Sequence, residues 1–437
     1  MKEFNTQPPS GTRDFLPEDV RSRERLFSAI KQVFESFGFL PIDTPAFERI
    51  ETLMGKYGEE GDKLVFKILK RGKQAATGEA NLALRYDLTV PLARFFAQYQ
   101  NQLPRPFRRY QIGPVWRADR PGKGRFREFY QCDVDIVGSP SLLADAEVIL
   151  ALTKSFSCLN LSGYIVRLNS RKILTGLLEA YGVPEGLRQD TLTILDKLNK
   201  VGVVGVVQEL KDRGLPEAIT SQISDDLLKK GVELRNRIKA SRTGQKGLEE
   251  VDEVMLLVAP LLTDGEIEFS PFLARGLDYY TGPIFEIYLK GMTGAVASGG
   301  RYDDLIGMFV GKQIPACGGS LGIDRILSTL DVSRGEGDTL KPQVFVTVWD
   351  RDSRAEALRI ATELRSEKIV VEISLGEGKI GNQVRFASER GALYCLFYGP
   401  DEQVRKKVTL KNLSTGEQIS VRREQVAETL KTLAQRR

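Results

Sequence analysis

The chain of 437 residues contains no histidine. Imidazole is a frequent general base and the commonest metal ligand, so its absence excludes a His-based catalytic triad and a His-ligated metal site. Cysteine is also scarce, because the four thiols of Cys132, Cys158, Cys317 and Cys395 lie far apart and form no CxxC pair. This spacing argues against a zinc site and against a disulfide framework. We therefore expect a reduced protein of the cytoplasm.

Long apolar runs are missing as well. No run approaches the ~18 residues that a membrane-spanning helix needs, and residues 1–10 lack the apolar core of a signal peptide. We expect no membrane association. The length predicts roughly three domains, and a hydrophobic fraction of 41% is enough for ordinary packed cores.

The formal net charge of +5 is concentrated at one end of the chain. Residues 341–437 carry 18 Lys and Arg against 13 Asp and Glu, which accounts for the whole excess. A basic C-terminal module would attract a phosphate backbone. An ordinary solvated surface with a slight Lys and Arg bias explains the same count, and charge alone leaves both interpretations open.

The first part of the chain mixes a helix with strands. Val20, Phe27, Ile30, Phe34 and Phe37 recur at helical spacing, and Gly38 can end that helix. Strand patterns follow at residues 64–68, 83–86, 107–112 and 134–137, and later at residues 283–289 and 295–297.

Two later segments have a different character. From residue 169 to about residue 246, leucines recur at helical spacing and strand patterns vanish, which predicts a small helical insertion. Residues 333–338 form a polar linker. After Pro342, strand and helix patterns alternate, which predicts a compact α/β domain with a largely parallel sheet.

A cationic loop lies between two predicted strands. Residues 117–129 read Arg-Ala-Asp-Arg-Pro-Gly-Lys-Gly-Arg-Phe-Arg-Glu-Phe. A strand–loop–strand of this kind can direct Arg117 and Arg125 at one polyphosphate, and Phe129 offers a flat surface for a purine. Taken alone, such a loop is more often simply solvated.

A second glycine-rich stretch spans residues 298–303 and 318–326. Arg325 stands near the start of its helix, where the helix dipole favours an anion such as phosphate. The plain alternative is an arginine on a helix surface.

Residues 275–282 read Arg-Gly-Leu-Asp-Tyr-Tyr-Thr-Gly. The tight backbone, the fixed cation of Arg275 and the phenols of Tyr279 and Tyr280 suit a pocket for a small polar ligand beside a phosphate. A formal GxGxxG at residues 376–381 also raises dinucleotide binding, but it follows the second predicted strand of the terminal domain rather than the first.

Taken together, these segments resemble those of the histidyl-tRNA synthetases, which are class IIa aminoacyl-tRNA synthetases. The resemblance implies an α+β class II catalytic core, built of an antiparallel sheet with helices, together with a helical insertion and a C-terminal α/β anticodon-binding domain. The implied boundaries are 1–168 and 251–332 for the core, 169–250 for the insertion, 333–341 for a linker, and 342–437 for the anticodon-binding domain.

The same resemblance implies an ATP site. Arg117 would bind the α-phosphate, Arg125 the terminal phosphates and Arg325 the γ-phosphate, while Phe129 would stack on adenine. Arg117 and Arg275 would be the catalytic residues. Mg²⁺ would be held mainly through ATP.

It also implies a histidine site. Asp87, Thr89 and Gln131 would hold the α-amino group and nearby polar atoms. Asp135 and Tyr280 would read the imidazole, whose neutral form has one donor and one acceptor. The remaining histidine-binding residues would be Arg275 and Tyr279. Each of these polar residues, taken singly, is more often structural.

The implied activity is that of a histidine–tRNA ligase, acting as a homodimer on histidine, ATP and tRNA-His. Two alternatives stay open: a non-catalytic paralogue that regulates ATP phosphoribosyltransferase, and a module that only senses histidine or tRNA. With no histidine present, we expect the enzyme's own side chains to give little pH dependence between about 6 and 8.

Overall fold

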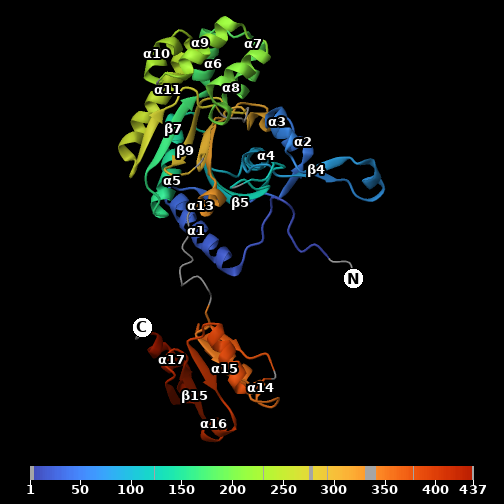
Figure 1. Ribbon diagram of the computed structural model, residues 1–437, viewed down its shortest axis with the longest axis vertical. Coiled ribbons are helices and arrows are strands. Elements are labelled where there is room, and N and C mark those ends of the chain that lie inside the picture. Colours follow the sequence, from blue (N-terminus) through green and yellow to red (C-terminus); the bar gives the residue numbers. More distant parts are fainter. Residues whose placement is uncertain are drawn as a thin grey trace. The chain divides into compact units, whose positions relative to one another are not determined.

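The computed structural model describes residues 4–122, 124–229, 231–274, 279–292, 294–329, 341–376 and 378–435. The chain divides into two compact units, Met1–Arg334 and Gly335–Arg437 (Figure 1). Each unit has its own hydrophobic core. None of the helices in the described ranges is long and apolar enough to cross a membrane.

An eight-stranded sheet forms the centre of the first unit, in the order β1-β5-β6-β11-β10-β9-β7-β8. Neighbouring strands pair antiparallel, except β1 with β5 and β7 with β8. The strands are β1 (Leu40–Pro41), β5 (Phe107–Trp116), β6 (Glu128–Val137), β7 (Tyr164–Ser170), β8 (Gly265–Phe269), β9 (Pro283–Leu289), β10 (Ala297–Arg301) and β11 (Ala316–Leu321). The antiparallel sheet with helices predicted from the sequence is confirmed.

Side chains alternate between the two faces of this sheet, and one face is apolar. Val134 and Ile136 of β6 are buried in the core on the side where α5 packs. Gln131, Asp133 and Asp135 therefore point to the opposite side, named here the polar face. The helical layer consists of α1 (Pro17–Ser36), α5 (Leu142–Cys158) and α11 (Arg242–Val258).

Helix α1 begins at Pro17, a residue suited to a first turn because it has no N–H to leave unpaired. Ile30 and Phe34 are fully buried, and the Phe34 ring centroid lies 6.0 Å from that of Tyr110 on β5. Val20 is 39% exposed. The buried apolar face predicted from the periodicity therefore does not include Val20 in the first turn of the helix.

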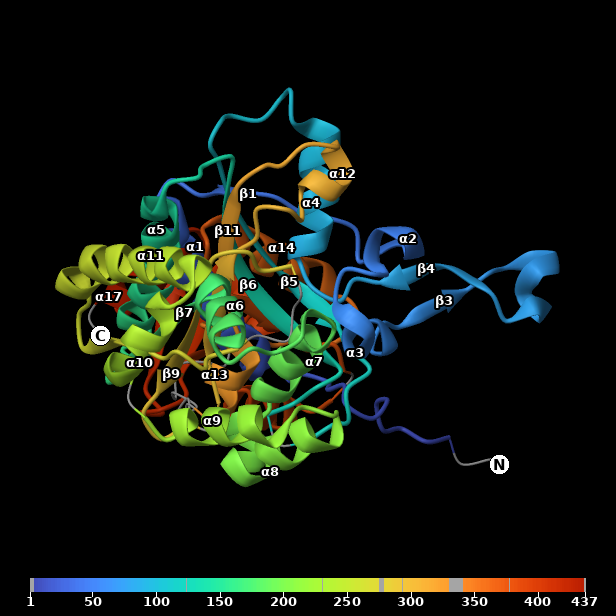
Figure 2. The same cartoon turned by 90° about the horizontal axis from the view of Figure 1, so that it is seen from above.

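A small three-stranded sheet, in the order β2-β4-β3, precedes β5 in the chain. Figure 2 shows β3 and β4 extending outward from the rest of the unit. The elements of this region are β2 (Phe47–Arg49), α2 (Ile50–Leu53), α3 (Gly58–Lys63), β3 (Lys67–Leu69), η1 (Gly72–Thr77), β4 (Ala80–Leu84) and α4 (Thr89–Tyr99).

The described residues between β7 and β8 form helices, which Figure 1 shows grouped at one end of the first unit. Helix α11 joins this group to the sheet, because it packs on α5, α6 and β7. The helices before α11 are α6 (Arg171–Ala180), α7 (Glu185–Leu195), α8 (Leu198–Asp212), α9 (Glu217–Leu227) and α10 (Gly231–Lys239). Shorter elements of this unit are η2 (Ala259–Leu261), α12 (Gly307–Val310) and α13 (Ile323–Thr329).

The second unit contains a five-stranded sheet in the order β13-β12-β14-β15-β16. The first three are parallel, but β15 and β16 add an antiparallel hairpin, so the sheet is more mixed than the sequence predicted. The elements are β12 (Val344–Val346), α14 (Arg354–Ser366), β13 (Val371–Ile373), α15 (Ile380–Glu389), β14 (Tyr394–Phe397), α16 (Pro400–Arg405), β15 (Lys407–Asn412), β16 (Gln418–Arg422), η3 (Arg423–Gln425) and α17 (Val426–Gln435).

Candidate active site

The hairpin of β5 and β6 decides which side chains share the polar face. Its pairs include Arg109 with Asp135 and Gly113 with Gln131. Directly opposed residues lie on the same side of a sheet. Gln131 and Asp135, two residues predicted to bind histidine, share this face because side chains alternate along β6, and the register adds Arg109 beside Asp135.

Two side chains hold Asp135 in place. Arg109 Nη2 lies 2.6 Å from Asp135 Oδ2, and the hydroxyl of Tyr302 donates to Oδ1. Oδ2 makes no aligned hydrogen bond within the described residues, so it keeps acceptor capacity. Gly318 of β11 lies opposite Asp135, and a Cβ on Gly318 would come within 1.9 Å of Oδ1. Glycine is needed there because the carboxylate lies directly over the β11 backbone.

A second acid shares the same cation. Asp133 Oδ2 lies 4.0 Å from Arg109 Nη2, and its side chain is 3% exposed. Burial raises the pKa of Asp133 from 3.8 to about 7, against the attraction of Arg109. Burial also raises the pKa of Asp135, again opposed by Arg109. The attraction of Arg109 therefore does not offset the effect of burial on the pKa of either carboxylate.

Asp87 follows β4 and precedes α4. Its Oδ1 accepts from the Tyr57 hydroxyl at 3.1 Å and from the Val90 N–H at 3.0 Å. Its Oδ2 is buried without a hydrogen-bond partner in the described part of the chain, and burial raises its pKa. Arg109 donates to the Leu88 carbonyl at 3.2 Å, which ties this segment to β5.

Gln131 and Thr89 are the other residues predicted to hold an α-amino group. Gln131 Nε2 donates to Ser320 Oγ at 3.2 Å, while its Oε1 is buried and finds no donor among the described residues. Thr89 is half-buried as the first residue of α4. A buried acceptor without a donor costs about 1–3 kcal/mol. Asp87 Oδ2 and Gln131 Oε1 are therefore suited to a ligand that brings N–H groups.

Tyr279 and Tyr280 lie close to the same cluster and are 7% and 8% exposed. The Tyr279 ring centroid is 4.9 Å from that of Tyr280 and 5.8 Å from that of Tyr302. Tyr302 in turn donates to Asp135, so this aromatic group adjoins the carboxylate. Arg275, the other predicted member of this motif, lies outside the described residues.

Arg117 directly follows β5 and faces two rings. Its Nε donates to the Tyr86 carbonyl at 3.1 Å. Its guanidinium carbon lies 4.3 Å from the Tyr86 ring centroid and 5.2 Å from that of Phe129. Phe129 stands two residues before Gln131 on β6, on the same face. A cation beside a flat ring suits a phosphate attached to a planar base.

The other two predicted phosphate ligands lie on separate elements. Arg125 belongs to the loop between β5 and β6, where its side chain is 55% exposed and pairs with Asp119 at 2.7 Å. Arg325 belongs to α13 and donates to the Ala295 carbonyl. Its neighbour Asp324 accepts the Tyr130 N–H at 2.6 Å, which fixes α13 against β6.

Sequence reasoning missed Arg109, Asp133, Tyr57 and Tyr302. Arg109 and Asp133 carried a usable signal. The loop between β5 and β6 sets the register that pairs Arg109 with Asp135, and Asp133 shares the face of Asp135 because it stands two residues away on the same strand. Tyr57 and Tyr302 gave none, since they approach from segments far away in the sequence.

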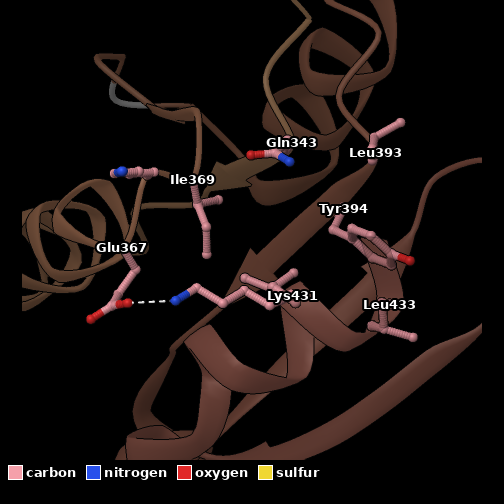
Figure 3. A pocket seen from close by; sticks show the side chains of 9 residues that line it. Gln343, Glu367, Ile369, Leu393, Tyr394, Lys431 and Leu433 are labelled. Atoms are coloured by element: carbon pink, nitrogen blue, oxygen red, sulfur yellow. Dashed lines mark hydrogen bonds and ion pairs between the residues drawn. The ribbon is translucent and has the colours of Figure 1, made fainter. Parts of the chain in front are cut away.

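The second unit holds a cavity of about 110 Å³, which Figure 3 shows with the Lys431–Glu367 ion pair of 2.6 Å. Typical small-molecule pockets measure about 300–1,000 Å³. This cavity is small and mainly apolar. Among the described residues, no cluster of three or more acids and cysteines could hold a metal ion.

The GxGxxG of residues 376–381 follows β13 and ends in the first turn of α15. Strand β13 is at the edge of its sheet. A Cβ on Gly376, Gly378 or Gly381 would meet nothing within 4 Å, so these glycines are not required for close packing. Because it follows an edge strand, the segment lacks the setting of a dinucleotide fingerprint.

Comparisons with known proteins identify the family of this chain. The family profile described as histidyl-tRNA synthetase matches residues 11–326, and one described as anticodon binding domain matches residues 343–433. A histidine–tRNA ligase of Christiangramia forsetii is 40% identical, with 94% of this chain and 96% of that protein covered. One of Paracoccus denitrificans is 39% identical over 95% of this chain and 91% of that protein.

Solved structures give the same result. The crystal structure of histidyl-tRNA synthetase from Nostoc sp. PCC 7120 has a TM-score of 0.75 and 32% identity, and covers 99% of this chain and 100% of that one. A Bacillus halodurans protein described as an ATP phosphoribosyltransferase regulatory subunit/histidyl-tRNA synthetase has a TM-score of 0.68 and 25% identity, covering 88% of this chain and 97% of that one. The regulatory alternative is thus not the better supported, and the chain belongs to the histidyl-tRNA synthetase family of ATP-using aminoacyl-tRNA synthetases.

Proposed function

We propose that the polar face of β5 and β6 is the site where histidine is activated with ATP before the histidyl group is transferred to tRNA-His. The observation that carries this assignment is the fixed carboxylate of Asp135. It is buried between Arg109 and Tyr302, yet Oδ2 keeps acceptor capacity. A carboxylate held in this way reads the N–H of a neutral heteroaromatic ring.

The α-ammonium of histidine would be held by Asp87, Thr89 and Gln131. Support comes from two buried oxygens, Asp87 Oδ2 and Gln131 Oε1, which find no donor in the described part of the chain. An ammonium group supplies three donors. Binding would therefore satisfy both acceptors and offset part of their burial cost.

The imidazole would lie between Asp135 and Tyr280, with Tyr279 and Arg275 completing the pocket. Here Gly318 leaves room for the carboxylate over the β11 backbone, and Arg109 and Tyr302 set its orientation. Tyr280 would donate to the second ring nitrogen.

ATP would lie along the outer part of the same face. Phe129 would stack on adenine and Arg117 would bind the α-phosphate, supported by the contact between their side chains. Arg125 and Arg325 would bind the outer phosphates, each presented from an element joined to the hairpin. Mg²⁺ would be held mainly by the ATP phosphates, whose charge it would neutralise.

In the first step, the histidine carboxylate attacks the α-phosphorus, and pyrophosphate leaves with the electrons of the broken P–O bond. The nucleophile is already an anion, so the protein needs no general base. Arg117 and Arg275 would stabilise the charge that grows on the α-phosphate oxygens. In the second step, a hydroxyl of the terminal adenosine of tRNA attacks the histidyl carbonyl, AMP leaves with the electrons of the broken C–O bond, and the adenylate phosphate would take the hydroxyl proton. This division of labour explains how a chain without histidine performs the reaction.

We further propose that residues 342–437 bind the anticodon region and that residues 169–250 form the insertion between core segments 1–168 and 251–332, with 333–341 as the linker. The matched anticodon binding profile and the excess of basic residues after position 340 support the first assignment. We also propose a homodimer, and a location in the cytoplasm where translation consumes charged tRNA.

The test is isotope exchange between pyrophosphate and ATP, with histidine, with each other common amino acid, and with none. Exchange that requires histidine alone is the expected result. A regulatory subunit or a sensing module would bind ligands without catalysing exchange. If the protein binds both histidine and ATP but shows no pyrophosphate exchange, the assignment is overturned.

A further inference from the structure

Residues 9–15, named here the N-terminal strap, cross the base of the loop between β5 and β6. The Gly11 carbonyl accepts the Arg127 N–H at 2.7 Å, and Arg127 Nη1 donates to the Ser10 carbonyl at 3.3 Å. Gly11 has φ +84°, and a Cβ there would lie 2.8 Å from Arg127 Cγ. The strap thus lies against the loop in a conformation that favours glycine.

Arg13 joins this loop to α13. Its Nη2 lies 2.6 Å from Asp324 Oδ1, and its guanidinium carbon lies 3.4 Å from the Phe126 ring centroid. The other oxygen of Asp324 accepts the Tyr130 N–H. Asp324 is 6% exposed at its side chain, whereas Arg13 is 29% exposed. A partly buried ion pair combined with a stacked ring is more rigid than an exposed pair.

The strap is anchored a second time on α1. The Phe15 ring lies 5.0 Å from the guanidinium carbon of Arg13 and 3.9 Å from that of Arg23. Arg23 also lies 4.5 Å from the Tyr130 ring centroid. Cations and rings therefore alternate from Phe126 through Arg13, Phe15 and Arg23 to Tyr130. This ladder fixes Arg13 relative to the sheet.

Two of the contacts of Arg13, those with Phe126 and Asp324, are next to proposed phosphate ligands. Phe126 follows Arg125, and Asp324 precedes Arg325. We propose that Arg13 is a positioning residue for ATP: it holds the loop and α13 at a fixed separation, so that Arg125 and Arg325 meet the outer phosphates together. This inference rests on the proposed function. Arg13 touches neither reacting atoms nor phosphate; it lowers the cost of ordering two separate elements when ATP binds.

The test compares Arg13→Ala and Arg13→Lys with the parent enzyme in histidine-dependent exchange. Misplacing a ligand group by ~1 Å can cost about 100-fold, so we expect kcat/KM for ATP to fall roughly 10- to 100-fold in Arg13→Ala. KM for histidine should change less than about twofold, because the contacts of Arg13 described above involve no residue proposed to bind histidine. Arg13→Lys keeps the charge opposite Asp324 but loses the planar stack on Phe126, and should fall between the two.

Arg167→Ala is the matched control. Arg167 also pairs with an acid, Glu268, at 2.7 Å and lies 4.7 Å from a ring centroid, that of Tyr288, at the far end of the same sheet. Its loss should leave both KM values unchanged. If Arg13→Ala does not fold, Arg13→Lys and Phe126→Leu carry the test. Equal rises in both KM values, or an unchanged kcat/KM for ATP, would overturn the role of Arg13.

Direct ATP binding, measured by calorimetry without histidine, separates this inference from the proposed function. A parent enzyme that exchanges pyrophosphate while Arg13→Ala binds ATP as tightly contradicts the inference alone. A parent enzyme that neither binds ATP nor exchanges pyrophosphate contradicts both.

Discussion

Arg109 forms an ion pair with Asp135 at 2.6 Å, and neither side chain is more than 2% exposed. A buried pair gains little net stability over an apolar one, because desolvation of both ions opposes their attraction. The pair on the polar face is therefore better explained by its effect on the orientation of the Asp135 carboxylate than by a gain in the free energy of unfolding.

Replacing Arg109 by methionine removes the only cation of this pair and leaves two buried acids. Breaking a buried ion pair from one side typically costs about 3–5 kcal/mol. We expect a loss of that size in the free energy of unfolding, measured with urea, and a rise in KM for histidine in any folded fraction. Arg108→Met is the neighbouring control, because Arg108 and Glu147 form a half-exposed pair that should contribute only about 0–1 kcal/mol. Equal losses in both variants would contradict the special role of Arg109.

Asp133 should make stability depend on pH. Its folded pKa, about 7, lies above the ordinary 3.8, so the folded chain keeps a proton that the unfolded chain has lost. The stabilising contribution of this proton to the free energy of unfolding is fully present below about pH 4. It falls as pH rises toward about 7 and then levels off. Asp133→Asn should therefore flatten unfolding free energy measured between pH 4 and pH 7.5. Some slope should remain, because the pKa of Asp135 is also raised. An unchanged slope would show that Asp133 ionises normally.

The sequence-based expectation of little pH dependence between about 6 and 8 rests on the absence of a side chain whose unperturbed pKa lies in that range. Burial brings an aspartate into the same range, which composition alone cannot reveal. The pH profiles of activity of the parent and of Asp133→Asn should differ in this window. Ionisation of the substrate imidazole, with pKa ~6.5, should affect both profiles equally.

Arg117→Ala and Arg275→Ala each remove a proposed cation at the α-phosphate. Loss of one such stabilising contact typically lowers the rate by about 10²–10³. Histidine-dependent pyrophosphate exchange should fall by that factor, while histidine binding measured by calorimetry should stay nearly constant. Exchange by Arg275→Ala at close to the parent rate would remove that residue from the catalytic assignment.

Ending the chain after residue 334 tests the second unit. The two units have separate hydrophobic cores, so the first should remain folded. We expect histidine-dependent exchange to persist and tRNA charging to fall sharply, because the proposed anticodon contacts are lost. Circular dichroism checks folding, and a filter-binding assay measures affinity for tRNA. Unchanged affinity in the shortened protein would contradict the proposed role of residues 342–437.

Much of the core could be predicted from the sequence, because periodicity and motif order identify long elements. The hairpin of β15 and β16 was missed, since alternate side chains of β16 are exposed and leave only a weak apolar pattern. In the site, Asp135 was predicted but Arg109 was not, although hairpin register pairs them. Tyr302 depends on tertiary packing that brings β10 near β6 through β11, which no local pattern encodes.

Discrimination between histidine and β-thienylalanine, an analogue of similar shape without ring nitrogens, tests most directly whether this face reads imidazole. A site built to hydrogen-bond a polar group rejects an analogue lacking it by about 10⁴–10⁵ in kcat/KM. We expect the parent enzyme to show a ratio of that order in pyrophosphate exchange, and Asp135→Leu to lose most of it by losing activity with histidine. A parent ratio below about 100-fold, the range of purely steric selection, would contradict the account.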